Sequence, residues 1–261
     1  MLRAFSTAAT GMTAQQILVD TIANNMANVN TTGFKRSQVN FQDLLYIKLS
    51  EAGTEVAAGI IAPAGTEIGS GVRVASTSKV FTGGELQNTG RSLDVAIRGD
   101  GFLQVSMPDG TIKYTCDGAL AINADGQLVT TTGYALEPSI SIPTDASSIT
   151  IAVDGGVNVT DASGANSVVG TLQLARFTNP AGLSADGDNL FSETEASGTP
   201  LTGEAGVNGF GTFQSGFLEK SNVQMVVELV NLITAQRAYE MNSRAIKAGD
   251  DMLRTATNMI R

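Results

Sequence analysis

Paired acidic side chains are the residues best suited to catalysis in this sequence. Asp250 and Asp251 are adjacent, and Glu193 and Glu195 are separated by one residue. Two carboxylates that face each other across a cleft can hydrolyse glycosidic bonds, one as general acid and the other as base or nucleophile. Nothing in the sequence places either pair across a cleft. We therefore interpret these carboxylates as solvated surface groups and predict no catalytic residues.

Three motifs that combine glycine with an acidic residue could bind ions. Asn123–Gly126 and Asp186–Asp188 could contribute calcium ligands, but neither has the twelve-residue ligand spacing with a closing glutamate. Gly99–Gly101 could cradle a phosphate, but strand-like residues follow it instead of a helix whose N-terminus would face the anion. We interpret all three motifs as tight turns and predict no metal and no cofactor.

The sequence contains few residues that could act as nucleophiles or bind a metal ion. The chain has no histidine and a single cysteine, Cys116. This composition excludes Ser-His-Asp and Cys-His nucleophile systems, zinc sites that contain histidine, and a disulfide within the chain. Cys116 could be a reactive thiol or a small residue at a strand edge. We favour the strand residue, because no histidine or lysine directly neighbours it in the sequence, and we predict that the protein is not an enzyme.

The charge and hydropathy of the chain limit the classes of partner that it can bind. The formal net charge is −9, which disfavours nucleic acid because phosphates repel an acidic surface. No apolar run approaches the ~18 residues that span a bilayer, so we expect no direct membrane insertion. Polar residues interrupt the segment Leu2–Met12, so we expect no cleaved secretory signal. The sequence predicts a chain that is cytosolic or leaves the cell by another route.

The N-terminal segment has the apolar spacing of a helix that packs along a narrow seam. Its seam positions are separated alternately by three and four residues, a pattern typical of coiled coils. The seam consists of Phe5, Ala8, Met12, Gln15, Val19, Ile22, Met26 and Val29. The polar Gln15 either fixes the register or is tolerated near an edge. The run of Asn, Thr and Gly over Asn28–Gly33 is expected to end the helix.

Three asparagines, Asn24, Asn25 and Asn28, lie near the end of this predicted helix. They could form a solvated face, or they could make hydrogen bonds between packed helices. We favour the hydrogen bonds, because Ala23 and Ala27 between them permit close approach of a neighbour.

The C-terminal segment has a longer repeat, which predicts a helix of about 40 residues. Apolar residues recur every seven positions, at Met225, Leu232, Tyr239, Ile246, Leu253 and Ile260. The alternate seam positions, which begin at Leu229, are mostly polar, and a second apolar stripe includes Met241 and Met252. A helix with two apolar stripes must contact more than one neighbour. We therefore predict that this helix is marginal alone and is stabilised by other helices.

The middle of the chain predicts an α+β fold, with long N- and C-terminal helices forming a coiled-coil-like pair, an inserted antiparallel β-rich domain and an extended arm. Short alternating apolar runs separated by Asp-Gly and related turns indicate antiparallel strands from about residue 80 to 217. We expect residues 1–35 and 221–261 to form a helical core domain, residues 36–76 an extended linker or arm, and residues 77–220 the β-rich outer domain. Within that domain, residues 183–211 are expected to form a long surface loop.

Three blocks of the sequence resemble the flagellar rod and hook family of axial proteins. They are Ala23–Arg36 (ANNMANVNTTGFKR), Asp94–Pro138 and Glu219–Leu253, and they follow one another in the order of that family. Phe41–Tyr46 (FQDLLY) and Gly65–Val72 (GTEIGSGV) are similar to elements of its distal-rod branch.

The resemblance implies a structural subunit of the bacterial flagellar basal body. It implies self-assembly as a homopolymer into a hollow, rigid helical tube, the distal rod, which crosses the periplasm, transmits torque to the hook and passes exported subunits. The implied partners are proximal rod proteins, the hook protein, the P-ring and L-ring bushings and the flagellar type III export apparatus. The alternatives are a proximal rod or hook paralogue of the family, a periplasmic carboxylate hydrolase, and a monomeric adhesin built on the β domain.

The residues that we expect at the assembly interface combine both predicted seams with the asparagines. They are Phe5, Met12, Val19, Ile22, Asn24, Asn25, Met26, Asn28, Val29, Met225, Leu229, Leu232, Tyr239, Met241, Ile246, Met252, Leu253 and Ile260.

Overall fold

The computed structural model describes residues 2–53, 55–57, 60–61, 63–162 and 164–259. The chain divides into two compact units. The helical unit comprises Met1–Met26, Ser37–Ser78 and Met225–Arg261, and the β unit comprises Ala27–Arg36 and Lys79–Gln224. The chain contains both helices and strands, and a β-rich region lies between the N- and C-terminal helices in the sequence. This confirms the coarse α+β prediction.

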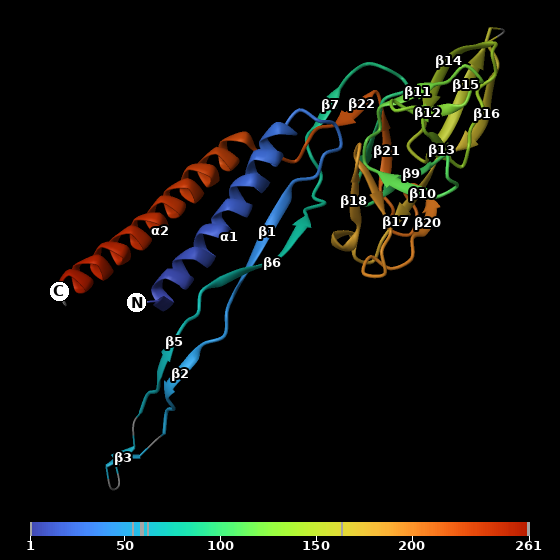
Figure 1. The fold of residues 1–261 in the computed structure, drawn as a ribbon. Coiled ribbons are helices and arrows are strands. Elements are labelled where there is room, and N and C mark those ends of the chain that lie inside the picture. Colours follow the sequence, from blue (N-terminus) through green and yellow to red (C-terminus); the bar gives the residue numbers. More distant parts are fainter. Residues whose placement is uncertain (1, 54, 58–59, 62, 163, 260–261) are drawn as a thin grey trace. The chain divides into compact units, whose positions relative to one another are not determined.

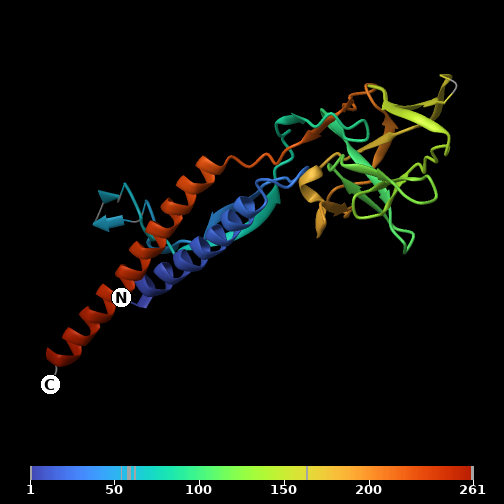
Figure 2. The same cartoon turned by 90° about the horizontal axis from the view of Figure 1, so that it is seen from above.

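The two helices of the helical unit are α1 (Leu2–Ala27) and α2 (Met225–Met259). They run antiparallel in Figures 1 and 2, in the blue and red ends of the chain. Small residues permit their contact, because a Cβ added at Gly249 of α2 would lie 2.8 Å from the ring of Phe5 of α1. Helix α1 ends directly before the Asn-Thr-Gly run, as predicted, and α2 begins after Gln224.

The segment predicted as an extended linker folds back on itself as a series of antiparallel strand pairs in the helical unit (Figure 1). The pairs are β1 (Ser37–Asp43) with β6 (Val72–Lys79), β2 (Ile47–Ser50) with β5 (Thr66–Ile68), and β3 (Glu55–Ala57) with β4 (Ile60–Ile61). The backbone N–H of Val72 donates to Thr10 Oγ1 at 3.4 Å, so this hairpin also contacts α1. The boundaries of the three expected regions stay a prediction.

The β unit is built around one large antiparallel sheet, which contains nine strands among the described residues. Its main path is β11 (Leu120–Ile122), β12 (Leu128–Thr130), β13 (Ala135–Glu137), β9 (Phe102–Ser106), β10 (Ile112–Thr115), β19 (Leu190–Ser192) and β18 (Ser184–Gly187). Strand β17 (Gln173–Arg176) pairs with β9 and with β20 (Leu201–Glu204).

Smaller antiparallel groups complete the β unit. They are the sheet β14 (Ala146–Ile151), β15 (Gly156–Asp161) and β16 (Asn166–Thr171), the pair β8 (Val95–Arg98) and β21 (Thr212–Ser215), and the pair β7 (Leu86–Asn88) and β22 (Phe217–Glu219). A short 3-10 helix, Pro180–Gly182, precedes β18. The alternating runs of the sequence therefore predicted the antiparallel character of this unit correctly.

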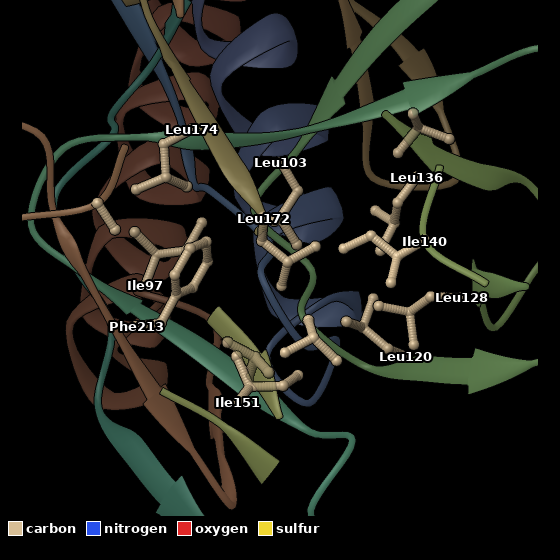
Figure 3. Close-up of a cluster of buried hydrophobic side chains, with 14 of the residues drawn as sticks. Ile97, Leu103, Leu120, Leu128, Leu136, Ile140, Ile151, Leu172, Leu174 and Phe213 are labelled. Atoms are coloured by element: carbon tan, nitrogen blue, oxygen red, sulfur yellow. The ribbon is translucent and has the colours of Figure 1, made fainter. Parts of the chain in front are cut away.

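The β unit has a dry interior of its own. One buried cluster is aliphatic apart from Phe213 and joins side chains from Val95 to Phe213 in the sequence. Figure 3 shows part of it, including Leu103, Leu172 and Leu128. A second cluster is aromatic, with edge-to-face contacts such as Tyr114 on Phe177 at 4.7 Å between ring centroids. Fully buried side chains of this size contribute about 1.5 to 3 kcal/mol each.

The expectation of a long surface loop over residues 183–211 was wrong. This stretch contains β18, β19 and β20. Asp188 and Asn189 adopt positive φ, which closes the tight turn between β18 and β19. Leu190 and Phe191 then enter the buried clusters. The glycine and acidic residues that suggested a loop are turn residues between short strands.

Candidate assembly interface

Most of the large apolar side chains of helix α2 are exposed to solvent. Over its first nine residues these side chains lie on several sides of the helix, and further exposed apolar residues follow toward its end. The exposed set is Met225, Val226, Val227, Leu229, Val230, Ile233, Tyr239, Met241, Met252 and Met259. A contiguous apolar surface of this kind is typical of a protein–protein contact.

The buried stripe of α2 consists instead of small or polar residues. Glu228, Ala235 and Gly249 are buried, whereas Leu232 and Ile246 are only half-buried. The close approach of Phe5 to Gly249 explains this arrangement, since only small side chains fit where the helix axes come near each other. The seven-residue repeat was therefore visible in the sequence, but the buried positions include a set that the apolar seam did not contain.

Most of the predicted seam of α1 already packs within the chain. Ala8 and Ile22 are buried, and the other predicted apolar positions of this helix are half-buried. Those positions are Phe5, Met12, Val19, Met26 and, just beyond the helix, Val29. They can offer a neighbouring molecule only the part of their surface that remains exposed.

The side chain of Asn25 makes its hydrogen bonds within the helical unit. Its Nδ2 donates to the Ser37 carbonyl oxygen at 2.9 Å, and the Ser37 N–H donates to its Oδ1 at 2.9 Å. This pair of hydrogen bonds fixes the start of β1 against α1 and uses the amide that we expected to bind another helix. Asn24 is exposed, and Asn28 accepts a hydrogen bond from the Thr31 hydroxyl at 3.1 Å.

The predicted residues of α2 divide between the two surfaces. Met225, Leu229, Tyr239, Met241 and Met252 are exposed. Leu232, Ile246 and Leu253 are half-buried, and Ile260 lies outside the described residues. The exposed Val226, Val230 and Ile233 were not among the predicted residues, because they fall outside both stripes. The near-continuous apolar run Met225–Ile233 was the sequence signal for them.

A second apolar surface lies on the strand pair β2–β5 and the residues before it. Leu45 is 89% exposed, and Tyr46, Leu49 and Ile68 are also exposed. Tyr46 lies against this pair, since a Cβ at Gly69 would be 3.5 Å from its ring. A two-stranded ribbon with apolar side chains on its surface is marginal in water, so contact with another surface would stabilise it.

A cavity of about 510 Å³ lies between α1 and α2. Gln16 and Val19 of α1 and Gln236, Tyr239 and Glu240 of α2 line it. It is wide enough for side chains of a neighbouring helix to enter the groove between the two helices.

The residues considered for chemistry occupy ordinary structural positions. Asp250 forms an exposed ion pair with Arg254 at 3.0 Å, and Glu193 and Glu195 are exposed. Gly99–Gly101 forms the turn between β8 and β9, as predicted. Asn123 Oδ1 accepts hydrogen bonds from the backbone N–H groups of Asp125 and Gln127, which is turn chemistry.

The other acidic motif and the cysteine are structural as well. Lys113 lies 2.8 Å from Asp186, and hydrogen bonds from Lys113 and then from Ser192 hold the pKa of Asp186 below its ordinary value. Burial raises the pKa of the Cys116 thiol to about 12, so the thiol stays protonated near neutral pH. Cys116 is thus a buried residue directly after β10, as the favoured reading of the sequence predicted.

Two negative findings apply to the part of the chain that the structure describes. It holds no helix that is both long and apolar enough to cross a membrane. It also holds no group of three or more Cys, Asp or Glu side chains placed to bind a metal ion.

Three family models match the chain in sequence order. They are the flagella basal body rod protein model over residues 5–35, the flagellar hook protein FlgE/F/G D1 domain over residues 96–159, and the flagellar basal body rod FlgEFG protein C-terminal model over residues 214–259. The flagellar basal-body rod protein FlgG of Borreliella burgdorferi is 47% identical over the whole of both chains. The chain belongs to the flagellar basal-body rod protein family.

Other relatives agree with this membership. The rod protein FlgG of Caulobacter vibrioides is 45% identical and that of Bacillus subtilis 38% identical, each over the full length of both chains. The family resemblance of the sequence blocks is therefore confirmed, and with it the prediction of a structural protein without enzymatic activity, located in the basal body of the flagellum. The alternative of a carboxylate hydrolase is not supported.

Proposed function

We propose that this protein is the structural subunit of the flagellar distal rod and that it polymerises helically with copies of itself through α1 and α2. The observation that carries the proposal is the exposed apolar surface of α2. In the polymer, α1 and α2 form a coiled-coil-like pair, and the pairs of many subunits line a hollow shaft. Rod-family membership supports this arrangement, since a rod needs a repeated axial contact.

The free energy of association depends on how much of the exposed surface of α2 is covered. Covering a half-exposed apolar side chain contributes about 1 kcal/mol, so the exposed set on α2 contributes on the order of 10 kcal/mol. Association costs about 4 to 15 kcal/mol in lost freedom of motion. The surface therefore supports stable assembly only when nearly all of it is covered, which more than one neighbour achieves better than a single partner.

The interface we propose centres on the exposed side chains of α2. It retains Met225, Leu229, Tyr239, Met241 and Met252 from the sequence prediction and adds Val226, Val230 and Ile233. The half-buried residues of α1 and α2 border this surface, and the α1–α2 groove receives side chains of a neighbouring helix.

The strand pair β2–β5 is the arm of the proposed assembly. The exposed Leu49 of β2 and Leu45 just before it contact a neighbouring copy and bridge adjacent subunits, which stiffens the shaft. Covering these side chains also removes apolar surface that an isolated ribbon leaves in water.

The proposed partners follow from the place of a distal rod in the flagellum. They are proximal rod proteins, the hook protein and the P-ring and L-ring bushings, with export through the flagellar type III apparatus. Relatives named as rod proteins and a hook-basal body complex protein support an axial position. A rod in this position crosses the periplasm, passes exported subunits through its channel and transmits torque to the hook.

A matched pair of substitutions tests the proposal in the full chain. Val226→Asp places a charge on the exposed surface of α2, and Val168→Asp does the same on β16 of the β unit, where the side chain is also exposed. Both substitutions are at solvent-exposed positions, so we expect each to change the free energy of unfolding by about 0.5 kcal/mol or less.

We expect Val226→Asp to abolish tube formation in sedimentation and electron microscopy, while Val168→Asp forms tubes like the unmodified protein. Equal assembly of both variants would show that α2 is not the interface. Purified chain that never forms tubes, even with partner rod proteins, would overturn the proposed function itself.

A further inference from the structure

Two short segments of the β unit connect it, along the chain, to the two helices. The N-terminal connector, Asn28–Arg36, follows α1, and the C-terminal connector, Glu219–Val223, precedes α2. Both contact a third segment, Val80–Glu85. Backbone N–H to carbonyl hydrogen bonds join the three: Gly33 to Glu219 (2.8 Å), Asn222 to Phe34 (3.4 Å), Val80 to Arg36 (2.9 Å) and Lys220 to Glu85 (2.9 Å).

A buried ion pair lies at the centre of this junction. Lys35 Nζ is 2.6 Å from Glu219 Oε1, and the two side chains are only 5% and 6% exposed. Lys35 Nζ also donates to the Thr82 carbonyl oxygen at 3.2 Å, and the Gly84 N–H donates to Glu219 Oε1 at 2.7 Å. The two charged residues are separated by 184 positions in the sequence. Both charges are thus satisfied only when all three segments are in place.

The side chain of Asn222 makes a second link among the same segments. Its Oδ1 accepts a hydrogen bond from the Arg36 N–H at 2.8 Å. Its Nδ2 donates to the Val80 carbonyl oxygen at 2.8 Å and to the Thr82 carbonyl oxygen at 3.1 Å. One amide of the C-terminal connector therefore bonds both the N-terminal connector and the third segment.

The energetic asymmetry of a buried ion pair makes such a junction cooperative. Removing one partner leaves an unpaired charge in a water-poor site, which is far more costly than replacing both partners by apolar groups. An exposed pair has no such asymmetry, because water solvates the remaining charge. Lys48 and Glu67 form such a pair, 3.9 Å apart with side chains 60% and 50% exposed.

We propose that this junction is a conformational latch that couples the two connectors, so that neither is ordered on the β unit unless the other is. Each connector supplies one half of the Lys35–Glu219 pair. The two hydrophobic clusters of the β unit contain no residue of either connector, so the unit can fold before the latch closes. The inference concerns the single chain and is independent of the proposed assembly.

Cys116 is a native reporter for the closed latch. The N-terminal connector crosses directly over it: a Cβ at Gly33, whose φ is +66°, would lie 2.9 Å from the Cys116 carbonyl carbon. Thr32 Oγ1 donates to Asp117 Oδ1 at 3.0 Å, and Asn189 Nδ2 donates to the Thr32 carbonyl oxygen at 2.9 Å. Because the chain has a single cysteine, thiol labelling reports this position alone.

The test substitutes Lys35→Met in the full chain and measures thiol labelling together with amide hydrogen exchange. We expect labelling of Cys116 to accelerate at least about tenfold, since the connector opens more often. We also expect faster exchange of the Gly84, Lys220 and Asn222 amides, which lie on the other two segments. The matched control Lys48→Met, in the exposed pair, should stay within about twofold of the unmodified protein.

Two results would overturn the latch. The first is faster exchange of the N-terminal connector alone, with Lys220 and Asn222 unchanged, because the connectors would then be independent. The second comes from the double variant Lys35→Met/Glu219→Met, which also decides the matter if the single variant does not fold. We expect the double variant to return to within about threefold of the unmodified labelling rate. A double variant as open as the single one would show that the pair does not couple the connectors.

Discussion

The two units of this protein bury their apolar residues to different degrees. The β unit places its large aliphatic and aromatic side chains in clusters of its own, and residues such as Val105 and Leu174 have no exposed surface. The helical unit leaves Val226, Val230 and Met241 of α2 in water. The β unit therefore has a hydrophobic interior of its own, whereas α2 exposes apolar surface that the proposed assembly would cover.

The charges divide between the units in the same way. The β unit carries eight basic and sixteen acidic residues, whereas the helical unit carries eight basic and nine acidic residues. Nearly all of the net charge of −9 thus belongs to the β unit. Like charges repel, so the acidic β unit resists close association with its copies, while the nearly neutral helical unit does not. In the proposed assembly, the β unit would contribute mainly stability and the helical unit mainly association.

The largest expected change in the free energy of unfolding comes from replacing a buried leucine by alanine, compared with the same replacement of an exposed leucine. Leu103→Ala removes a side chain that is 1% exposed in the aliphatic cluster of the β unit, and Leu45→Ala removes one that is 89% exposed just before β2. We expect Leu103→Ala to lower the free energy of unfolding by about 3 kcal/mol, because it leaves a cavity. Leu45→Ala should change it by less than about 0.5 kcal/mol. Urea denaturation followed by circular dichroism measures both free energies of unfolding. Equal losses would contradict the difference in burial between the two side chains.

An intermediate effect is expected where the two helices touch. Gly249→Val forces a side chain against the Phe5 ring, which we expect to destabilise the α1–α2 contact by about 1 to 3 kcal/mol. Ala248→Val, at the exposed neighbouring position, should cost only the difference in helix propensity, about 0.6 kcal/mol. The loss of helical circular dichroism on heating compares the two variants. A Gly249 variant as stable as the Ala248 variant would mean that the helices do not depend on this close approach.

A smaller effect follows from the buried thiol of the β unit. Burial raises the pKa of Cys116 from 9.0 to about 12, so an unfolded chain loses this proton first as the pH rises. The protonated thiol therefore contributes its full stabilisation of the folded state below pH 9. This contribution is lost progressively as the pH rises toward 12, and the loss at pH 10 is about 1.4 kcal/mol. Urea midpoints at pH 8 and pH 10 should therefore differ more for the unmodified chain than for Cys116→Ala. The same pH dependence in both would contradict the burial effect.

Local patterns predicted the elements but not the contacts between them. Heptad spacing predicted both helices, and alternation with Asp-Gly turns predicted the antiparallel strands, because these signals lie within a few residues of each other. The partners of Asn25 and Asn222 could not be predicted, because they are backbone atoms 12 and 142 positions away. Nothing local in the sequence accounts for a glycine within α2, and only the proximity of Gly249 to Phe5 explains it.

Amide hydrogen exchange of the full chain, measured on dispersed subunits and again after assembly, tests whether neighbouring molecules stabilise α2. The account predicts that the amides of α2 exchange readily in dispersed subunits and slow by at least about 100-fold on assembly, whereas those of β9 and β10 are protected equally in both states. An α2 that is already as protected as β9 in dispersed subunits, and gains nothing on assembly, would contradict the account.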